Sequence, residues 1–530
     1  MMTKKKWLPI AIIALAVQFI GEAALVYNIL GLNVLPGKYL ALAIGGLVVA
    51  LLVTFGLLFA GLKKPAGKGK KARRIIGIIF AVIVTVASVC GALALGKIAS
   101  ALDKVTSDEG TPEASVGIYV LKEDKAQSIN DLAGYNFGIM EGLDDANTQI
   151  ALSEVKGIIG EVTTDPYESI NDVAKALYDG TDKAILVNEE YANLLSETDD
   201  FADWEEKARL VYEINISTEQ YDEYLKQNGI NPDDMDSDAE EIESQTNPVG
   251  SITEDPFIIY ISGSDTRAKV LKKSRSDVNI LAVVNPKTKM VLLLNTPRDY
   301  YVPNPAGRGK LDKLTHLGLY GVNNSIKALG DLYECDVNYY GQLNFTGFET
   351  LIDAIGGIDV NSSKAFKSGN VKGFSFVKGN NHMSGAQALA FVRERYAFGS
   401  GDNMRGQNQM KVISAIITKL TSGDSQVLLN YGTIMDSMSG MFRTDLERTE
   451  IESLVKMQLS DNSEWTIKSF AVTGSGASEI TYSMPGTRCY VMKQNKKLVT
   501  QACGLVDKVI NGEILTDEDV QVEKATKAKK

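Results

Sequence analysis

The chain has 530 residues, of which 45% are hydrophobic, and its formal net charge at pH 7 is -11. This length predicts two or three folded units, and the apolar content excludes a chain that is disordered throughout. The acidic balance argues against a general nucleic-acid binder, which normally has a basic surface. With only two histidines, His316 and His382, a histidine-based catalytic triad or metal site is a poor hypothesis.

Three apolar stretches open the chain, at about 7–30, 39–62 and 75–96. Each is long enough to cross a bilayer core of roughly 30 Å as a helix, and the first is too long for a cleaved signal peptide. We therefore expect residues 1–96 to form a membrane anchor with three transmembrane helices. Glu22 lies near the predicted outer end of the first helix and is interpreted as an interfacial residue.

Basic residues predict the orientation of this anchor. Lysines at 4–6 precede the first span, and the loop at 63–74 between the second and third spans is rich in lysine and arginine, whereas the intervening loop holds only Lys38. Basic loops remain on the cytoplasmic side of a membrane. The N-terminus and the 63–74 loop are thus predicted to be cytoplasmic, and the chain after about residue 97 extracellular. The protein is expected in the cell membrane, as a multi-pass protein with the lipid bilayer as a partner.

The segment 97–250 is predicted to be an extracellular α/β accessory domain that begins with a linker and ends in an acidic linker. Its pattern loosely resembles one lobe of a solute-binding protein, which identifies no ligand. The predicted strands are Val116–Leu121, Tyr135–Met140 and Lys183–Val187, and the predicted helices are Ser169–Tyr178 and Glu189–Leu195.

Beyond residue 256, three short apolar strands are flanked by polar motifs. The strands are predicted at Phe257–Ile261, Val278–Val284 and Met290–Leu294, and a turn-forming sequence joins the last two into a hairpin. If the first and third strands are parallel and the second is antiparallel, the polar groups at their ends meet at one edge of one sheet. These groups are Asp265, Arg275, Asp277, Arg298 and Asp299.

Two predicted helices add further arginines to this set. A helix at Met383–Val392, with Ser384 as its N-cap, leads into Arg393 and Arg395. A second helix starts near residue 401 and carries Arg405 and Gln409. Guanidinium groups bind phosphate bidentately and keep their charge, and carboxylates beside phosphate oxygens suit Mg²⁺.

Each of these motifs is weak by itself, because surface arginines more often form ion pairs of little energetic value. Their ordered series is far more specific. From Gly263 to Gln409 it reads Gly-Ser-Asp-x-Arg, Arg-Ser-Asp, Pro-Arg-Asp, Val-Arg-x-Arg and Asp-x-x-Arg-x-x-x-Gln, with supporting runs at Asn344–Phe348, Asp353–Val360 and Gly385–Ala390.

Over about 257–420 this series resembles the LytR-CpsA-Psr family, most of all its capsule-type members with several spans and an accessory domain. The resemblance implies a mixed central sheet flanked by helices, an α/β/α catalytic domain at 251–513 with a C-terminal extension. A disordered tail is expected at 514–530.

The resemblance further implies a phosphotransferase that moves a glycopolymer, capsular or teichoic-acid-like, from a polyprenyl-pyrophosphate carrier to peptidoglycan. Arg298 and Asp299 would be catalytic, with Asp299 as general base or as the ion-pair partner of an arginine. Asn408 stands where many family members carry an arginine. By resemblance, Asp265 and Asp277 would hold Mg²⁺ or Mn²⁺, and Arg275, Arg298, Arg393, Arg395, Arg405 and Gln409 would bind the phosphates.

Three alternatives remain open from the sequence. The same site could hydrolyse a polyprenyl-pyrophosphate glycan with water as the acceptor, or bind it without turnover as a membrane-bound sensor or regulator of envelope synthesis. A transcription attenuator would need a cytoplasmic DNA-binding element, and the only basic cytoplasmic stretch is the short 63–74 loop. No nucleic-acid partner is expected. A disulfide between Cys489 and Cys503 is equally open.

Overall fold

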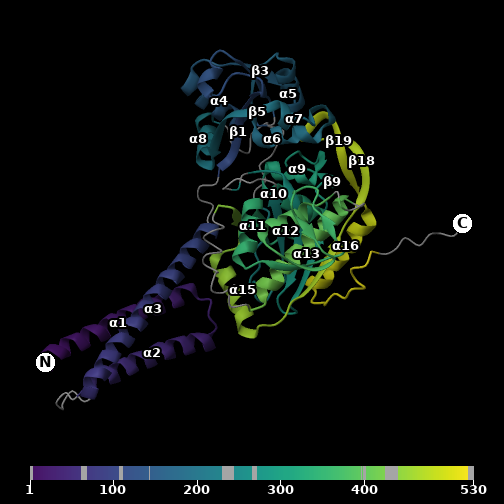
Figure 1. The fold of residues 1–530 in the computed structure, drawn as a ribbon. Helices are drawn as coiled ribbons and strands as arrows, with labels where there is room; N and C mark the ends of the chain where they lie inside the picture. The colour runs from purple at the N-terminus through teal and green to yellow at the C-terminus, as the bar shows by residue number, and fades with distance from the viewer. Residues whose placement is uncertain are drawn as a thin grey trace.

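The computed structural model describes residues 4–60, 68–106, 112–142, 144–229, 244–264, 271, 273–395, 397, 401–423 and 440–522. Figure 1 shows three parts: a bundle of long N-terminal helices, a small α/β domain, and a larger α/β domain that contacts both. We call the last two the accessory domain and the catalytic domain.

Three apolar helices form the N-terminal bundle: α1 (Lys4–Leu32), α2 (Gly37–Phe59) and α3 (Lys68–Thr106). Within them, Trp7–Leu32, Gly37–Phe59 and Lys71–Ser100 are long and apolar enough to span a membrane, as predicted. α3 continues to Thr106, so the linker expected from residue 97 is helical over its first part.

Glu22 is buried within the helical bundle, and its place at the membrane interface stays a prediction. Its side chain is only 3% exposed within the bundle and accepts a hydrogen bond of 2.8 Å from the side-chain amide of Gln18. Burying a carboxyl group is costly unless it has a polar partner. Gln18, one helical turn earlier on the same helix, provides that partner.

The accessory domain is a five-stranded sheet of order β3-β2-β4-β1-β5 with helices packed on it. β2 is parallel to β3 and β4, and β1 is antiparallel to β4 and β5. Every strand and helix predicted here is present. The strands are β1 (Pro112–Leu121), β2 (Asn136–Met140), β3 (Thr163–Tyr167), β4 (Ala184–Asn188) and β5 (Ala208–Ser217); the main helices are α4 (Asp145–Ile159), α5 (Ile170–Asp179), α6 (Glu189–Leu194) and α8 (Thr218–Gln227).

The catalytic domain is built on a six-stranded mixed sheet of order β16-β11-β6-β7-β8-β17. β6 is parallel to β11, β8 is parallel to β17, and β7 is antiparallel to both β6 and β8. This arrangement confirms the predicted hairpin and the assumed strand directions. The strands are β6 (Phe257–Ser264), β7 (Ser276–Asn285), β8 (Met290–Asn295), β11 (Tyr339–Leu343), β16 (Phe442–Thr444) and β17 (Thr466–Ala471).

Alternation of side chains along the strands gives this sheet two buried faces. Ile258 and Tyr260 point to the face covered by α10 (Val322–Tyr333) and α16 (Lys496–Ile510). Phe257 belongs to the opposite face, which packs against the helix α13 (Gly401–Thr421). The predicted fold class, a mixed central sheet flanked by helices, is thus confirmed.

A third apolar cluster joins α11 (Phe345–Ala354), α12 (Gly385–Arg393) and α13. The predicted N-cap of α12 is confirmed, because the Ser384 side chain accepts a hydrogen bond from the backbone N–H of Gln387.

The C-terminal part differs from expectation in two ways. Leu515 is 2% exposed in the core under α16, and Asp519 pairs with Lys508 at 2.6 Å, so the expectation of a disordered tail is wrong for residues 514–522. Residues 523–530 lie outside the described chain. All four cysteines are free, so Cys489 and Cys503 are not bridged.

A close backbone approach generates the first prediction. A Cβ added to Gly318 would collide with the carbonyl oxygen of Ser274, just before Arg275. Gly318→Ala should therefore destabilise the fold by about 1–3 kcal/mol through overpacking. Gly157 in α4 has no neighbour within 4 Å of such an atom, so Gly157→Ala should stabilise by about 0.5–1 kcal/mol. Thermal unfolding of both variants checks this, and equal shifts would contradict it.

A half-buried carboxyl group in the accessory domain generates the second prediction. Burial raises the pKa of Asp144 from 3.8 to about 6, against hydrogen bonds from Asn147 and Asn188 that lower it. Since the folded chain disfavours the charged form, stability is greatest below the ordinary pKa and falls as pH rises toward the folded value. Asp144→Asn should remove that loss, so its stability gain over the parent should be larger at about pH 7.5 than at about pH 4.5.

The measurement is the unfolding midpoint of parent and variant at both pH values. Glu161→Gln, an exposed change in the same domain, serves as the control. A pH-independent difference between Asp144→Asn and the parent would contradict the assignment.

Candidate functional site

The strand directions bring the predicted polar motifs to one edge of the catalytic sheet. The carboxyl ends of β6, β8 and β11 meet the amino end of β7 there, because β7 alone of these four runs antiparallel. Asp277 is the second residue of β7, and Arg298 follows the end of β8. This is where open α/β sheets place their ligands.

Arg298 and Asp277 form the central ion pair of this edge. Nη1 of Arg298 lies 2.6 Å from Oδ1 of Asp277, and the two side chains are 9% and 18% exposed. Such a charge-assisted hydrogen bond is stronger than a neutral one and fixes the orientation of the guanidinium group. The Thr315 hydroxyl approaches the same carboxylate oxygen at 3.4 Å, and the Thr315 backbone N–H donates to the Arg298 carbonyl at 2.8 Å.

Asp299 lies between two cations. Its Oδ1 is 3.6 Å from Nε of Arg298 and 3.7 Å from Nζ of Lys313, and the Lys313 side chain is 4% exposed. Both contacts are longer than a hydrogen bond, so they orient charges without fixing a bidentate geometry. The ion-pair role that the sequence left open for Asp299 is therefore present in the structure.

Asp312 is the centre of a buried hydrogen-bond network, which we call the Asp312 hub, next to Lys313 in the chain. Asp312 and His316 are both 0% exposed, and Oδ1 of Asp312 lies 2.8 Å from Nδ1 of His316. Its Oδ2 accepts hydrogen bonds from the Ser483 hydroxyl at 2.6 Å and from the side-chain amide of Asn304 at 3.2 Å. Lys313 is next to this hub in sequence, so its position depends on the hub.

A ladder of buried hydroxyl groups positions Arg275. The side chains of Ser264 and Ser274 are 2.6 Å apart, and those of Ser262 and Ser276 are 2.9 Å apart. These bonds tie the end of β6 to the start of β7 on both sides of the intervening loop. Arg275, 8% exposed, is thereby held at the same edge.

The start of α13 crosses the end of β8. A Cβ on Gly406 would collide with the side chain of Asn295, the last residue of β8. The neighbours Arg405 and Gln409 are 6% and 7% exposed. Asn408, where many family members carry an arginine, is 1% exposed, and its amide donates to the carbonyl of Phe391 at 3.4 Å. This position therefore serves packing between α12 and α13.

Arg393 and Arg395 are more accessible. The Arg393 guanidinium lies 4.6 Å from the ring centroid of Phe345, which follows β11, and the side chain is exposed. Between the two arginines, Glu394 is fully buried and accepts backbone hydrogen bonds from Gly369 at 2.6 Å and Ala397 at 2.8 Å. Burial alone would raise the pKa of Glu394, but these hydrogen bonds hold it below its ordinary value. The buried glutamate anchors the backbone that carries both arginines.

The predicted metal ligands are only partly placed. Asp265 lies outside the described residues. Within the described ranges, no group of three histidine, cysteine or acidic residues is arranged to hold a metal ion. Both side-chain contacts of Asp277 named above reach Oδ1, so Oδ2 is the oxygen that this residue can present to a cation.

The sequence reasoning missed Asp312, Lys313 and Thr315. Their signal was a run of polar residues, two of them charged, spaced between Leu311, Leu314 and Leu317. A polar side chain inside an apolar segment is a reason to expect a hydrogen-bonded network.

Comparison with known proteins decides the family. The family described as LytR_cpsA_psr matches residues 221–502, a little over half of the chain. The chain belongs to the LytR-CpsA-Psr family. This match includes the whole catalytic sheet and every charged residue of the candidate site.

Two relatives within this family carry the name polyisoprenyl-teichoic acid–peptidoglycan teichoic acid transferase TagU. The Bacillus cereus protein is 34% identical over 203 residues, which are 38% of this chain and 64% of that protein. The Enterococcus faecalis protein is 33% identical over 223 residues, which are 42% and 72% of the two chains. A solved structure of TagT bound to LI-WTA is 27% identical and covers 51% of this chain and 97% of that one, with a TM-score of 0.40.

The Asp312 hub generates the third prediction. Asp312→Ala should destabilise the protein by about 3–5 kcal/mol, because it leaves His316 and Ser483 buried with a lost partner. The matched control is the exposed pair of Asp359 and His382. Each side chain is 63% exposed, and Oδ1 of Asp359 lies 3.4 Å from Nδ1 of His382. Asp359→Ala should cost less than about 1 kcal/mol. Thermal unfolding measures the loss of stability in both variants. Losses of similar size would contradict the stabilising role of the Asp312 hub.

Proposed function

We propose that this protein is a phosphotransferase that moves a glycopolymer from a polyprenyl-pyrophosphate carrier to peptidoglycan at the outer face of the cell membrane. The observation that carries the proposal is the sheet edge where Arg275, Arg298 and Arg405 are all buried in a family member. Guanidinium groups bind phosphate oxygens bidentately and keep their charge, so arginines gathered at one sheet edge suit a pyrophosphate. The names of the TagU relatives describe the same class of transfer.

The proposed reaction breaks one bond and forms one. A sugar hydroxyl of the acceptor attacks the carrier-distal phosphorus, a P–O bond forms, and the bridging P–O bond breaks to release polyprenyl phosphate. Arg298 would neutralise charge on the phosphates while Asp277, whose carboxylate also accepts a hydrogen bond from the Thr315 hydroxyl, holds its guanidinium in place. Preorganised charge of this kind supplies most of the catalysis in phosphoryl transfer. Asp299 is the candidate to receive the hydroxyl proton.

Further contacts to the pyrophosphate would come from Arg393 and Arg395. Their side chains are more exposed than that of Arg298, which suits a substrate that enters from solvent. Mg²⁺ or Mn²⁺ is proposed at Asp277 Oδ2 with Asp265 and the phosphate oxygens, an environment with few carboxylates that Mg²⁺ favours. The cation would supply Lewis-acid neutralisation of the pyrophosphate.

Membrane placement supports a lipid-linked donor. Helix α15 (Arg448–Asp461) of the catalytic domain contacts the end of the helical bundle: Arg448 pairs with Asp103 at 2.9 Å, and Lys456 donates to Asn33 at 3.0 Å. The basic start of α3 lies at the opposite end of that long helix from Asp103 (Figure 1). With basic loops inside, the catalytic domain would be extracellular and close to the outer leaflet.

The fourth prediction tests this function. Full-length protein in nanodiscs is incubated with Mg²⁺, peptidoglycan strands and a polyprenyl-pyrophosphate-linked capsular or teichoic-acid-type oligosaccharide. We expect polyprenyl phosphate and a sugar-phosphate-glycan adduct. Arg298→Ala and Asp277→Asn should each reduce adduct formation by about 10²–10³-fold, as removal of one preorganised charged group does in other enzymes.

Arg488→Ala is the matched control, because Arg488 is 62% exposed and pairs with Glu479 on the surface. Its rate should equal that of the parent. Polyprenyl phosphate without an adduct would identify a hydrolase, and donor binding without either product would identify a sensor. The oligosaccharide that yields an adduct identifies the polymer class.

A further inference from the structure

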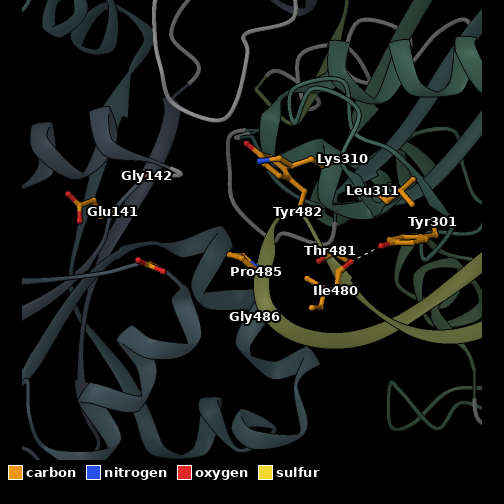
Figure 2. A pocket seen from close by; sticks show the side chains of 11 residues that line it. Glu141, Gly142, Tyr301, Lys310, Leu311, Ile480, Thr481, Tyr482, Pro485 and Gly486 are labelled. Atoms are coloured by element: carbon orange, nitrogen blue, oxygen red, sulfur yellow. Dashed lines mark hydrogen bonds between the residues drawn. The ribbon is translucent and has the colours of Figure 1, made fainter.

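A cleft of about 680 Å³ lies between the accessory domain and the catalytic domain. Glu141 and Glu168, at the carboxyl ends of β2 and β3, form one wall. Tyr301, Lys310 and Tyr482 from the catalytic domain contribute to the other (Figure 2). The volume falls in the range of known ligand sites, roughly 300–1,000 Å³.

The walls of the cleft are fixed relative to each other. Met484, at the start of β19 (Met484–Gln494), is 1% exposed inside the apolar core of the accessory domain. Asn171 of α5 also donates a hydrogen bond to Thr487 of the same strand. The hairpin of β18 (Gly474–Thr481) and β19 thus inserts into the accessory domain, and the cleft beside it is largely preformed.

The aromatic residues of the cleft are held in place from behind. The Tyr301 hydroxyl donates to the carbonyl of Ile480 at 2.7 Å, as Figure 2 shows. Tyr482 is 8% exposed, stacks close to Gly307, and has the Lys310 ammonium 5.3 Å from its ring centroid. Tyr301 is more exposed than Tyr482, so its fixed ring offers the cleft an apolar face with little entropy to lose on binding.

Fixed aromatic rings beside carboxylates suit a glycan. The C–H faces of sugar rings pack on aromatic faces, and carboxylates accept charge-assisted hydrogen bonds from hydroxyl, amide and ammonium groups. Glu141 and Glu168 are both exposed and face the cleft, against the single cation Lys310. A phosphate-rich polymer would be repelled by these carboxylates, whereas a glycan with N-acetyl groups and amine-bearing peptides would be attracted.

The chain segments that line the cleft lead directly into the candidate site. Tyr301 begins β9 (Tyr301–Pro303) only three residues after Arg298, so the two lie within about 11 Å of each other along the backbone. β9 pairs with β10 (Leu311–Lys313), whose last residue contacts Asp299. The two-stranded ribbon of β9 and β10 therefore carries Tyr301 of the cleft and Lys313 of the candidate site.

We propose that this interdomain cleft is the binding site for the acceptor glycan, so that the accessory domain contributes one wall of the acceptor site. The inference rests on the proposed transfer function. It assigns the two domains complementary tasks: the catalytic edge binds the pyrophosphate of the donor, and the cleft holds an amine-bearing glycan strand with its hydroxyl directed toward that edge.

The test measures acceptor binding without any donor, so its outcome does not depend on transfer. Fluorescent peptidoglycan strand fragments with stem peptides are titrated into full-length protein in nanodiscs. The double variant Glu141→Gln/Glu168→Gln should weaken binding by about tenfold or more, as expected for loss of charge-assisted hydrogen bonds. Tyr301→Ala should weaken it similarly, and Tyr301→Phe, which keeps the ring, should retain most of the affinity.

Glu161→Gln is the matched control, since Glu161 is an exposed residue near the opposite end of β3. It should leave binding unchanged, and unfolding midpoints of all variants establish that they are folded. Unchanged binding in both the double variant and Tyr301→Ala would overturn the proposal. So would binding of poly(glycerol phosphate) that these variants abolish, because the cleft would then hold the donor polymer. Neither result bears on the proposed transfer function, which the assay with Arg298→Ala tests separately.

Discussion

The antiparallel direction of β7 between the parallel strands β6 and β8 is the constraint on which the candidate site depends. A hairpin returns the chain to the edge from which it came, so the start of β7 lies beside the ends of its two neighbours. Asp277 and Arg298 are 21 residues apart in the chain, yet this pairing brings their side chains to 2.6 Å. Parallel strands alone would have placed Asp277 at the opposite edge.

The charged side chains buried at this sheet edge need charged partners, and these partners must themselves be held in place. Arg298 is held by Asp277, and Lys313 lies beside Asp299. The segment that carries Lys313 is itself fixed by the pair of Asp312 and His316. Removing one member of a buried network costs more than the network contributes as a whole. These contacts hold Arg298 and Lys313 in fixed positions, the preorganisation that the proposed electrostatic catalysis requires.

The same hub links the site to the accessory domain. Ser483, which bonds to Asp312, immediately precedes Met484, which is buried in the accessory core. One short turn thus belongs to both domains. This turn fixes the accessory domain to the catalytic domain. It therefore also fixes the two walls of the cleft relative to each other. The helical bundle joins the same unit at its other end, through α15.

The sequence by itself located the main elements of this protein and indicated its family. Apolar runs of sufficient length located the three candidate spans, and short apolar runs bounded by polar and turn residues located β6, β7 and β8. The ordered arginine and aspartate motifs indicated the family that the comparison then established. These features are local, since each depends on residue type and spacing within a short segment.

Only the tertiary structure decided which charges meet. Asp312 and Lys313 carry no motif, and their roles arise from Ser483 and Asp299, which are distant in sequence. Leu515 was misjudged for a related reason, because burial depends on what a neighbouring element covers. The interdomain cleft has the same origin. A contact between residues far apart in the chain is set by packing of whole elements, and no local pattern encodes it.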